Sequence, residues 1–476
     1  MVDYPKLRHG LEAVAIEHQG QRRVLLRDCL GYAPDSLLIP VKLAALLLQM
    51  NGENSLRDLQ AYYVRLTGEL LFMENLQDFI KKLDDNCFLE NEHFQQLVNQ
   101  EIQDFQQGPI RRMRHAGTSY PVDPKALRSQ LDHLFSSLSG SERKKEEHGG
   151  DLVGLIAPHI DLNAGGPCFA HAYRVVLTGD SPATWVVLGT GHEPIKNYFA
   201  LTLKDFETPL GMVRCDQEFS RRLLQRAPRD LLAGEYSHRK EHTIEFQAVF
   251  LAHTRPASQI VPLLCSFSLE DWEADRAYID EVAGLLRDTA LQADNPIGFL
   301  ASVDLAHIGP RYGDAFRPHM GTIRENLDAD RELLEILSHC DALEFMHRIG
   351  REKNRRRICG MAPLYVLAGM LEGSAEGEVL EHSYAIVDNQ GSFVTFAAMA
   401  FYEKAGKKTA ASEQDQEAKP SAGCGGSSDN GTGGKATTRS RFSASARSIT
   451  RRSTPRAMPA QGGRWAMLSR NISGRD

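Results

Sequence analysis

The chain has 476 residues and a formal net charge of −7, and its composition is 42% hydrophobic and 25% charged. This length exceeds the usual size of one hydrophobic core, and the composition excludes wholesale disorder and a fibrous class. No apolar stretch reaches the ~20 residues of a spanning helix, and residues 1–30 lack the apolar block of a secretory signal. We therefore expect a cytoplasmic protein with two or three structural units and no membrane segment.

Charge and cysteine usage narrow the function classes. Residues 431–476 hold ten Lys or Arg and one acid, so the rest of the chain is more acidic than the total. An acidic body disfavours specific nucleic-acid binding, which requires a basic surface to neutralise phosphates. The eight cysteines form no CxxC pair, so we expect reduced thiols, most of them buried.

Residues 1–105 are predicted to form a small, mainly helical unit. Two β-like pieces at 23–27 and 37–39 precede a helix over 41–50, which ends at an Asn-Gly turn. Ser55 is a candidate N-cap for a second helix, and a third helix ends at Asn86, with a short strand expected from Cys87. This order resembles the winged-helix-like modules of the PqqD family. A helical packing domain without a ligand is the favoured interpretation, and a peptide- or partner-binding module is the alternative.

The next predicted unit is a layered α/β domain over residues 110–403. Residues 95–115 are Gln-rich and end in the basic cluster Arg111, Arg112 and Arg114, so we expect an exposed connection between domains. Apolar β-rich runs then alternate with helical patterns, which is typical of a largely buried sheet. The expected strands are 152–157, 184–189, 260–265, 297–303 and 393–401, and the expected helices include 167–177, 243–252 and 271–291.

Residues 405–476 differ in kind from the rest of the chain. They are rich in Ser, Gly, Lys and Thr, later in Arg and Ser, and have no apolar periodicity, so we expect a disordered basic tail. A solvated tail is favoured over a non-specific contact with nucleic acid or a membrane surface.

Polar residues with metal-binding chemistry follow several predicted strands. His159 follows 152–157, His192 follows 184–188, and Asp304 and His307 follow 297–303. Ligands bind at the carboxyl ends of strands in open α/β sheets, so these residues are expected to face one crevice. Each histidine alone is more often structural than a ligand, and the prediction rests on the combination.

Cys359 and residues near His242 extend this candidate site. Cys359 lies among arginines before an apolar helix, which predicts a lowered pKa and a thiolate. Two imidazoles, a thiolate and a carboxylate suit a redox-active or divalent metal such as iron, copper or zinc. His242 and Glu245 are one helical turn apart, so we expect them to present both heads together as supporting or acid/base groups.

Seven phrases in order make the chain resemble the Memo family, whose bacterial and archaeal members are called AmmeMemoRadiSam system protein B. They are His115-Ala116-Gly117-Thr118-Ser119-Tyr120-Pro121, Ala157-Pro158-His159, Leu188-Gly189-Thr190-Gly191-His192, Glu207-Thr208-Pro209-Leu210-Gly211, Glu241-His242-Thr243-Ile244-Glu245, Ser302-Val303-Asp304-Leu305-Ala306-His307 and Cys359-Gly360. The resemblance implies a fold similar to LigB-type class III extradiol dioxygenases. It also implies His159, His192 and Cys359 as metal ligands, with Asp304, His307 and His242 as the candidate catalytic residues.

Two departures from the family pattern alter the expected mouth of the site. The Ala-Gly-Tyr that usually follows Pro-His is replaced here by Ile160-Asp161-Leu162, and the common Ser-His-His is Gly191-His192-Glu193. These changes alter the aromatic wall of the pocket, replace an imidazole by an acid and make the mouth more acidic.

The resemblance implies a metal-dependent redox enzyme or accessory factor that acts with a radical-SAM protein and an Ammecr-type protein, on a substrate left open. A thiolate ligand disfavours extradiol chemistry, which usually uses two histidines and a carboxylate and exposes thiolates to oxidation. Whether the chain is an enzyme also stays open. The alternatives are a non-catalytic scaffold that binds a peptide or small molecule in the same crevice, and a copper- or iron-buffering protein.

Overall fold

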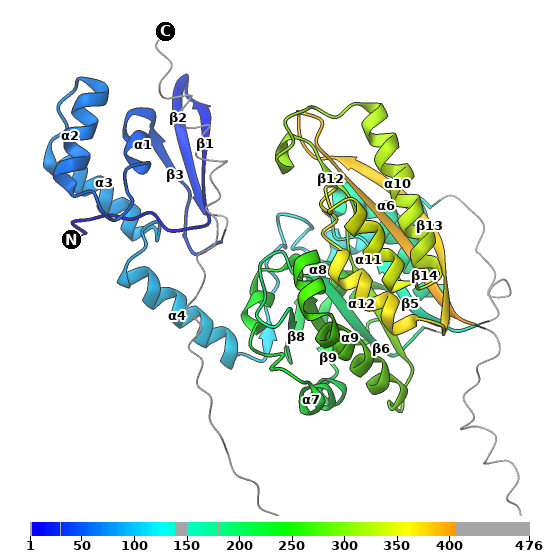
Figure 1. The fold of residues 1–476 in the computed structure, drawn as a ribbon. Coiled ribbons are helices and arrows are strands. Elements are labelled where there is room, and N and C mark those ends of the chain that lie inside the picture. Colours follow the sequence, from blue (N-terminus) through cyan, green and yellow to red (C-terminus); the bar gives the residue numbers. More distant parts are fainter. Residues whose placement is uncertain (1, 29, 139–149, 179–180, 405–476) are drawn as a thin grey trace, which may run out of the picture. The chain divides into compact units, whose positions relative to one another are not determined.

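The computed structural model describes residues 2–28, 30–138, 150–178 and 181–404, which fall into two compact units that divide between Ile102 and Gln103 (Figure 1). The tail over 405–476, predicted to be disordered, lies outside the described residues. Among the described residues, no helix combines the length and apolar character needed to cross a membrane.

The first unit pairs a small antiparallel sheet with helices. The sheet has the order β1-β2-β3, and its strands are β1 (Leu11–His18), β2 (Gln21–Asp28) and β3 (Leu37–Pro40). The helices are α1 (Val41–Leu47), α2 (Leu56–Thr67), α3 (Met73–Asp85) and α4 (Glu92–Gln107), the last of which crosses the boundary between the units. The pieces predicted at 23–27 and 37–39 are therefore β2 and β3, whereas β1 was not anticipated.

Local sequence signals account for the helix ends in the first unit. Ser55 accepts a hydrogen bond from the backbone N–H of Asp58, whose carboxylate binds the Ser55 N–H in return, so α2 begins with a capping box. α3 runs to Asp85 with Asn86 as its C-cap, which agrees with the predicted end. The strand expected after Cys87 is wrong, because only Leu89 forms a single bridge, to Leu7.

The second unit is built on one large sheet. Within the described residues it has 11 strands in the order β12-β14-β5-β11-β6-β10-β9-β8-β4, with β13 beside β14 and β7 beside β10. The strands are β4 (Ile110–Arg111), β5 (Leu152–Ala157), β6 (Thr184–Thr190), β7 (Phe199–Leu201), β8 (Asp205–Thr208), β9 (Gly211–Cys215), β10 (Gln259–Cys265), β11 (Ile297–Ser302), β12 (His307–Ile308), β13 (Ala375–Ile386) and β14 (Phe393–Glu403). The centre, β5-β11-β6-β10, is parallel, and β14 joins β5 antiparallel.

Helices cover both faces of this sheet. They are α5 (Pro124–Ser136), α6 (Leu162–Thr178), α7 (Gln217–Arg226), α8 (His242–Thr254), α9 (Leu269–Leu291), α10 (Met320–Ser338), α11 (Ala342–Arg351) and α12 (Met361–Leu371), with short 3-10 helices Glu235–Arg239 and Pro310–Tyr312. α9 and α12 pack on one side with α11 and α7, whereas α5, α6 and α8 lie on the other. The predicted layered α/β class is confirmed.

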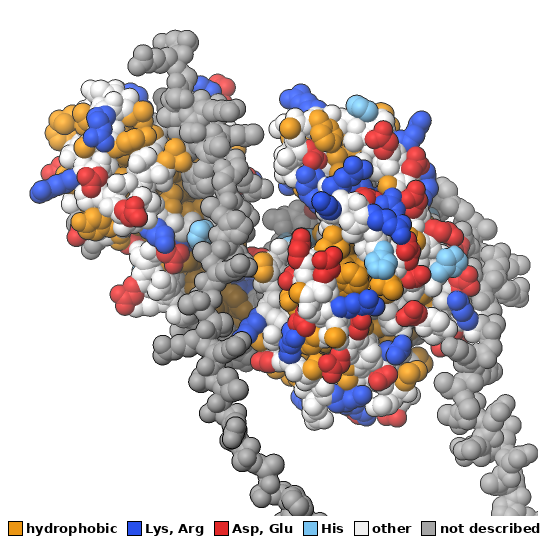
Figure 2. Space-filling view, viewed as in Figure 1, with side chains coloured by type: hydrophobic (Ala, Val, Ile, Leu, Met, Phe, Trp, Pro, Cys, Tyr) orange, Lys and Arg blue, Asp and Glu red, His pale blue; other side chains and the backbone are white. Residues whose placement is uncertain are grey.

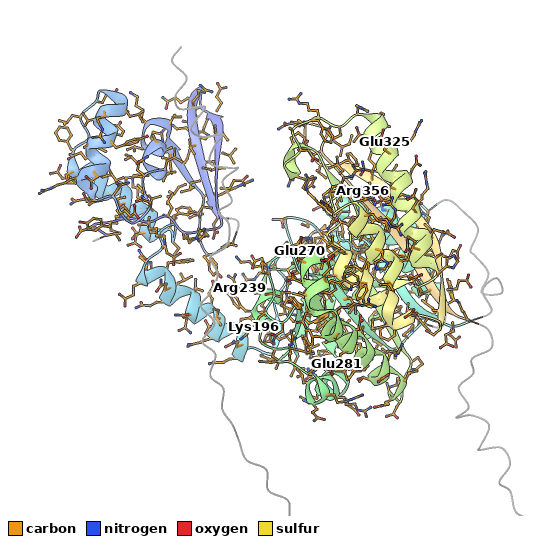
Figure 3. All side chains as sticks on the ribbon, viewed as in Figure 1. Lys196, Arg239, Glu270, Glu281, Glu325 and Arg356 are labelled. Atoms are coloured by element: carbon orange, nitrogen blue, oxygen red, sulfur yellow. The ribbon has the colours of Figure 1, made fainter. Side chains whose placement is uncertain are left out.

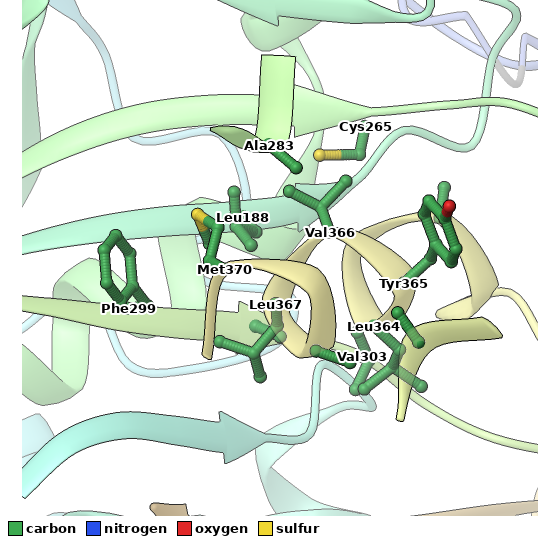
Figure 4. Close-up of a cluster of buried hydrophobic side chains, with 14 of the residues drawn as sticks. Leu188, Cys265, Ala283, Phe299, Val303, Leu364, Tyr365, Val366, Leu367 and Met370 are labelled. Atoms are coloured by element: carbon green, nitrogen blue, oxygen red, sulfur yellow. The ribbon is translucent and has the colours of Figure 1, made fainter. Parts of the chain in front are cut away.

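Alternation along each central strand divides the core between the two faces. In β6, Val186 and Leu188 join the cluster under α12, whereas Trp185 and Val187 join the cluster under α6 and α8. Side chains alternate with a period of two along a strand, so a strand covered on both faces must be apolar throughout. Figure 4 shows the first cluster, in which Leu364 and Val366 of α12 lie among residues from the sheet.

The outer faces of the covering helices carry charge. Glu270 and Glu281 on α9 and Glu325 on α10 are exposed (Figure 3). In the space-filling view, acidic and basic side chains of the second unit are interspersed with small apolar areas (Figure 2). Because one face of these helices is charged and the other is buried, their sequences are amphipathic. α8 and α12 are buried nearly all round, so their sequences are mainly apolar.

The exposed connection predicted over 95–115 is wrong in two respects. Residues up to Gln107 form helix α4, and Arg111 is completely buried. The Arg111 guanidinium forms an ion pair with Glu245 and also donates to the carbonyls of His238 and Glu241. The ion pair and the two hydrogen bonds offset the desolvation cost of burying this guanidinium. Glu245 lies 134 residues away, so the local sequence gives no sign of this pairing.

Candidate metal centre

Three adjacent parallel strands end in register at one edge of the sheet. β11 lies between β5 and β6, and Ser302 at its end is opposite both Ala157 and Gly189. The residues that follow these strands are His159, Asp304 and His192, so the register brings them together. This is the arrangement expected from their strand-end positions.

His159 is buried and held in one orientation. Its ring Nδ1 lies 3.0 Å from the Ser302 carbonyl oxygen, which can only accept, so Nδ1 carries the hydrogen. The backbone N–H of His159 donates to Asp304 Oδ1 at 3.0 Å. Ring Nε2 is left facing Cys359 Sγ at 3.3 Å and Asp304 Oδ2 at 3.6 Å. Burial, helped by the nearby His192 and His242, keeps the pKa of His159 well below its usual value, so the ring is in the neutral form that coordinates metals.

His192 and His242 complete a triangle of imidazoles with His159. One ring nitrogen from each of the three lies within 4.8 Å of the others. The His192 and His242 rings are stacked, with centroids 5.0 Å apart and planes 16° from parallel. His242, predicted as a catalytic neighbour, therefore occupies the same triangle as the two predicted ligand histidines.

The Glu241 carboxylate contacts both stacked rings. Its Oε1 is 3.1 Å from Nδ1 of each of His192 and His242. Burial opposes charge at His192, but hydrogen bonds with Cys359 and Glu241 outweigh it and raise the pKa of His192 to about 11. Burial likewise opposes charge at Glu241, yet the two histidines hold the pKa of Glu241 well below its ordinary value.

Cys359 contacts the triangle from the loop before α12. Its Sγ is 3.6 Å from the Asp304 carbonyl oxygen, and the next residue, Gly360, donates its N–H to the same oxygen at 3.2 Å. A Cβ at Gly360 would lie 2.5 Å from the Val303 side chain, so only glycine allows the loop this close to β11. The Cys359-Gly360 pair is thus explained by close packing beside the crevice.

The lowered pKa predicted for Cys359 is wrong. Burial raises the pKa of its thiol, and the hydrogen bond with His192 only partly offsets this. The neighbouring arginines are turned to other partners: Arg357 pairs with Asp314, and Arg356 pairs with Asp330. Sequence proximity of a cation lowers a thiol pKa only where the cation faces the sulfur.

Asp304 and His307 lie around this cluster. Burial raises the pKa of Asp304 to about 6, although the backbone N–H groups of His159 and Ile160 donate to its Oδ1. His307 is held by its own local contacts: Nδ1 donates to the Leu305 carbonyl at 3.0 Å, and the ring packs edge-on against Tyr312 at 5.0 Å. Burial lowers the pKa of His307 to about 4.

Glu245 does not join His242 at the crevice, contrary to expectation. Its buried carboxylate pairs with Arg111 and accepts from the Tyr120 hydroxyl and from the backbone N–H groups of Arg114 and His115. The His115–Tyr120 phrase therefore fastens the start of the second unit to α8. The carboxylate that contacts His192 and His242 is instead Glu241, one residue before the helix, to which the sequence analysis gave no role.

The donor set is compatible with a single transition-metal ion. With metal–nitrogen bonds of about 2.0–2.1 Å and metal–sulfur bonds of about 2.3 Å, sulfur and nitrogen on one tetrahedral ion lie roughly 3.6 Å apart. Cys359 Sγ and His159 Nε2 are separated by 3.3 Å. The His192 side chain is 39% exposed, so the cluster is accessible from solvent on that side.

Fold and site together define a class of protein: a layered α/β protein with a histidine-rich crevice at the carboxyl ends of adjacent parallel strands. The particular family follows from comparison with known proteins. Residues 111–400 match the family model described as Memo-like protein, and the chain belongs to this Memo family.

Several curated relatives carry the same family name. The chain is 28% identical over 382 residues to a MEMO1 family protein of Aquifex aeolicus, covering 80% of this chain and 96% of that protein. It is 29% identical over 298 residues to one of Methanopyrus kandleri, covering 60% and 96%, and 26% identical over 330 residues to one of Thermus thermophilus, covering 69% and 93%. The resemblance to the Memo family is thereby confirmed.

Proposed function

We propose that this Memo-family chain binds one transition-metal ion in the crevice, iron or copper by preference and zinc as a third candidate. His159, His192 and Cys359 are the proposed ligands, and His242 offers a further nitrogen. The observation that supports the proposal most strongly is the triangle of three ring nitrogens within 4.8 Å, with the Cys359 sulfur 3.3 Å from one of them.

The chemistry proposed for the site is redox. A bound iron or copper ion supplies one-electron chemistry or polarises a coordinated group. The chain's own residues hold and orient it: the Ser302 carbonyl and Asp304 fix His159, and the Asp304 carbonyl lies against Cys359. Asp304, His307 and His242 are the candidates to contact a substrate. Extradiol dioxygenase activity stays disfavoured, because a thiol at the metal is prone to oxidation.

The proposal includes a role beside a radical-SAM protein and an Ammecr-type protein, as a redox enzyme or an accessory factor. Partner binding is the second candidate function, and one observation in the first unit favours it. Leu66, Leu70 and Phe72, around the connection from α2 to α3, are exposed by 43%, 68% and 57%. Large apolar side chains gathered in one exposed segment often mark a protein-binding surface.

The metal proposal is tested by purifying the full chain without chelators and quantifying iron, copper and zinc by mass spectrometry. We expect one equivalent of metal per chain, and a marked loss in His159→Ala, His192→Ala and Cys359→Ala. His339→Ala is the matched control, because His339 is an exposed histidine at the end of α10. The absence of stoichiometric metal, or unchanged occupancy in Cys359→Ala, would contradict the proposal.

Cobalt substitution separates the roles of Cys359 and His242. Thiolate ligation gives Co(II) a sulfur-to-metal charge-transfer band in the near ultraviolet. We expect this band in the parent chain and in His242→Ala, and its loss in Cys359→Ala. A Co(II)-loaded parent chain without the band would exclude the thiolate and leave three imidazoles as the ligand set.

A further inference from the structure

Several hydrogen-bond donors surround the Glu241 carboxylate. It lies at the N-cap of the 13-residue helix α8 and accepts from the backbone N–H groups of His242 and Thr243. It also accepts from the backbone N–H of His192 at 3.0 Å. Its oxygens are 3.1 Å from the ring Nδ1 atoms of both His192 and His242. The side chain is only 8% exposed, so these groups replace water around the charge.

We propose that Glu241 is a positioning residue that fixes two imidazoles of the metal centre at once, and this inference rests on the proposed metal site. Both Glu241 oxygens already accept from backbone N–H groups, Oε1 from His242 and Thr243 and Oε2 from His192, so they act as acceptors and Nδ1 of each ring carries the hydrogen. The other nitrogen, Nε2, is then the one available to the crevice. His159 reaches the same state through a different acceptor, the Ser302 carbonyl.

The shared acceptor also accounts for the relative orientation of the two rings. His192 belongs to the segment after β6, and His242 begins α8, so no local backbone geometry aligns them. Both rings point Nδ1 at one carboxylate, and they stack within 16° of parallel. Groups that hold the second nitrogen of a metal-binding histidine set its tautomer and ring orientation, and their loss typically lowers metal affinity by about 10–100-fold.

Two substitutions separate this role from helix capping. Glu241→Asp keeps a charged residue that is a strong N-cap, but the side chain is one methylene shorter and cannot reach both rings. Glu241→Gln keeps the length but has a single acceptor oxygen, and its amide N–H groups face donors. Asp123→Ala is the matched control, because it removes the side-chain cap of α5 and leaves the crevice untouched.

The first measurement uses the metal-free full chain. Imidazole Nδ1–H groups that donate to a carboxylate give downfield proton resonances, which His192→Ala and His242→Ala assign. Because Nδ1 carries hydrogen in both the neutral and the protonated ring, the signals do not depend on ring charge. We expect both resonances in the parent chain and in Asp123→Ala, and the loss or shift of at least one in each Glu241 variant. Unchanged resonances in both Glu241 variants would overturn the proposal.

The second measurement is the affinity for Zn(II) and Co(II), obtained by competition with a chelator. We expect Glu241→Gln and Glu241→Asp to weaken binding by about 10–100-fold and Asp123→Ala to leave it unchanged. Equal affinity in the parent and both Glu241 variants overturns the positioning role. A parent chain that binds neither ion and carries no stoichiometric iron or copper overturns the proposed function itself, so the two failures are distinguishable.

Discussion

Buried polar side chains near α8 each depend on partners from distant segments. Glu245 is surrounded by Arg111, Tyr120 and backbone N–H groups of the segment before α5, and His238 donates from Nε2 to the Ala200 carbonyl at 2.8 Å. Removing one partner of a buried charged group costs more than the bond contributed, because the group left behind has also lost water. Single substitutions here should therefore have measurable effects on stability.

Tyr120→Phe tests the fastening of the segment 111–120 to α8. The variant removes the hydroxyl that donates to Glu245 and leaves the aromatic ring in place. We expect the free energy of unfolding to fall by about 1.5–3 kcal/mol, the usual range for a hydrogen bond to a charged group. Urea denaturation measures this loss. Tyr384→Phe is the matched control, because it makes the same change at a half-buried tyrosine on β13. Equal losses in the two variants would show that Glu245 does not need the hydroxyl.

His238 predicts a loss of stability in mild acid. Burial lowers the pKa of His238 from 6.5 to about 4, opposed by the Ala200 carbonyl and Glu241 and aided by Arg111 and Lys204. The unfolded chain binds a proton at this histidine at a higher pH than the folded chain does. The contribution of neutral His238 to the free energy of unfolding is therefore complete above pH ~6.5 and is lost as the pH falls towards ~4, to a total of about 3 kcal/mol. Urea midpoints across this range should fall less steeply in His238→Gln than in the parent. Exposed His339→Gln should follow the parent, and a slope unchanged in His238→Gln would refute the assignment.

At the scale of elements, each part of the site is held by a buried element. His159, Asp304 and His192 follow three neighbouring strands, His242 begins α8, and Cys359 precedes α12. α12 is buried on all sides between the sheet, α9 and α11, so the loop carrying Cys359 has a rigid support. Sites supported by packed elements hold their geometry more closely than sites on free loops.

Leu364→Ala tests the packing of α12, which supports the loop that carries Cys359. Leu364 is completely buried in α12, and removing most of its side chain leaves a cavity in the cluster that Figure 4 shows. We expect the free energy of unfolding to fall by about 2–5 kcal/mol, as for other buried leucines. Leu291→Ala at the exposed end of α9 is the matched control and should change it by less than about 0.5 kcal/mol. A loss near the control value would mean that the core around α12 collapses to fill the space.

At the scale of the whole molecule, two units carry separate apolar cores. The core of the first unit contains side chains from β2, α1, α2 and α3, whereas both large clusters of the second unit lie against its sheet. The Memo-like match falls in the second unit, and the Aquifex aeolicus relative matches a longer part of the chain. This division predicts that metal binding and partner binding are separable.

A chain of residues 103–404 should fold and retain the metal content of the full chain, because every proposed ligand and its support lies in that unit. If the first unit recruits partners, the shortened chain should no longer co-purify with a co-expressed radical-SAM or Ammecr-type protein. The full chain with Leu70→Asp and Phe72→Asp is the sharper test, since it should lose the partner and keep the metal. Retention of partners by both forms would exclude the first unit as the binding surface.

Much of the fold was predictable from local patterns. The strands at 152–157, 184–189 and 260–265 are present because a doubly covered strand must be apolar at every position, and that pattern is visible in the sequence. The edge strand β13 was not recognised, because its half-exposed residues show no such run. The start of α2 was also predictable, because the capping residue Ser55 and its partner Asp58 lie within one stretch of four residues.

The sequence by itself determined which residues follow the central strands, and hence His159, His192 and Asp304 as neighbours, because parallel strands in register end at one edge. Only the tertiary structure determined which charged side chains pair with one another. Two glutamates four residues apart, Glu241 and Glu245, have opposite roles: the first holds the crevice histidines, and the second pairs with Arg111. Helical spacing cannot distinguish them, since their partners come from distant segments and burial determines which contacts each carboxylate must make.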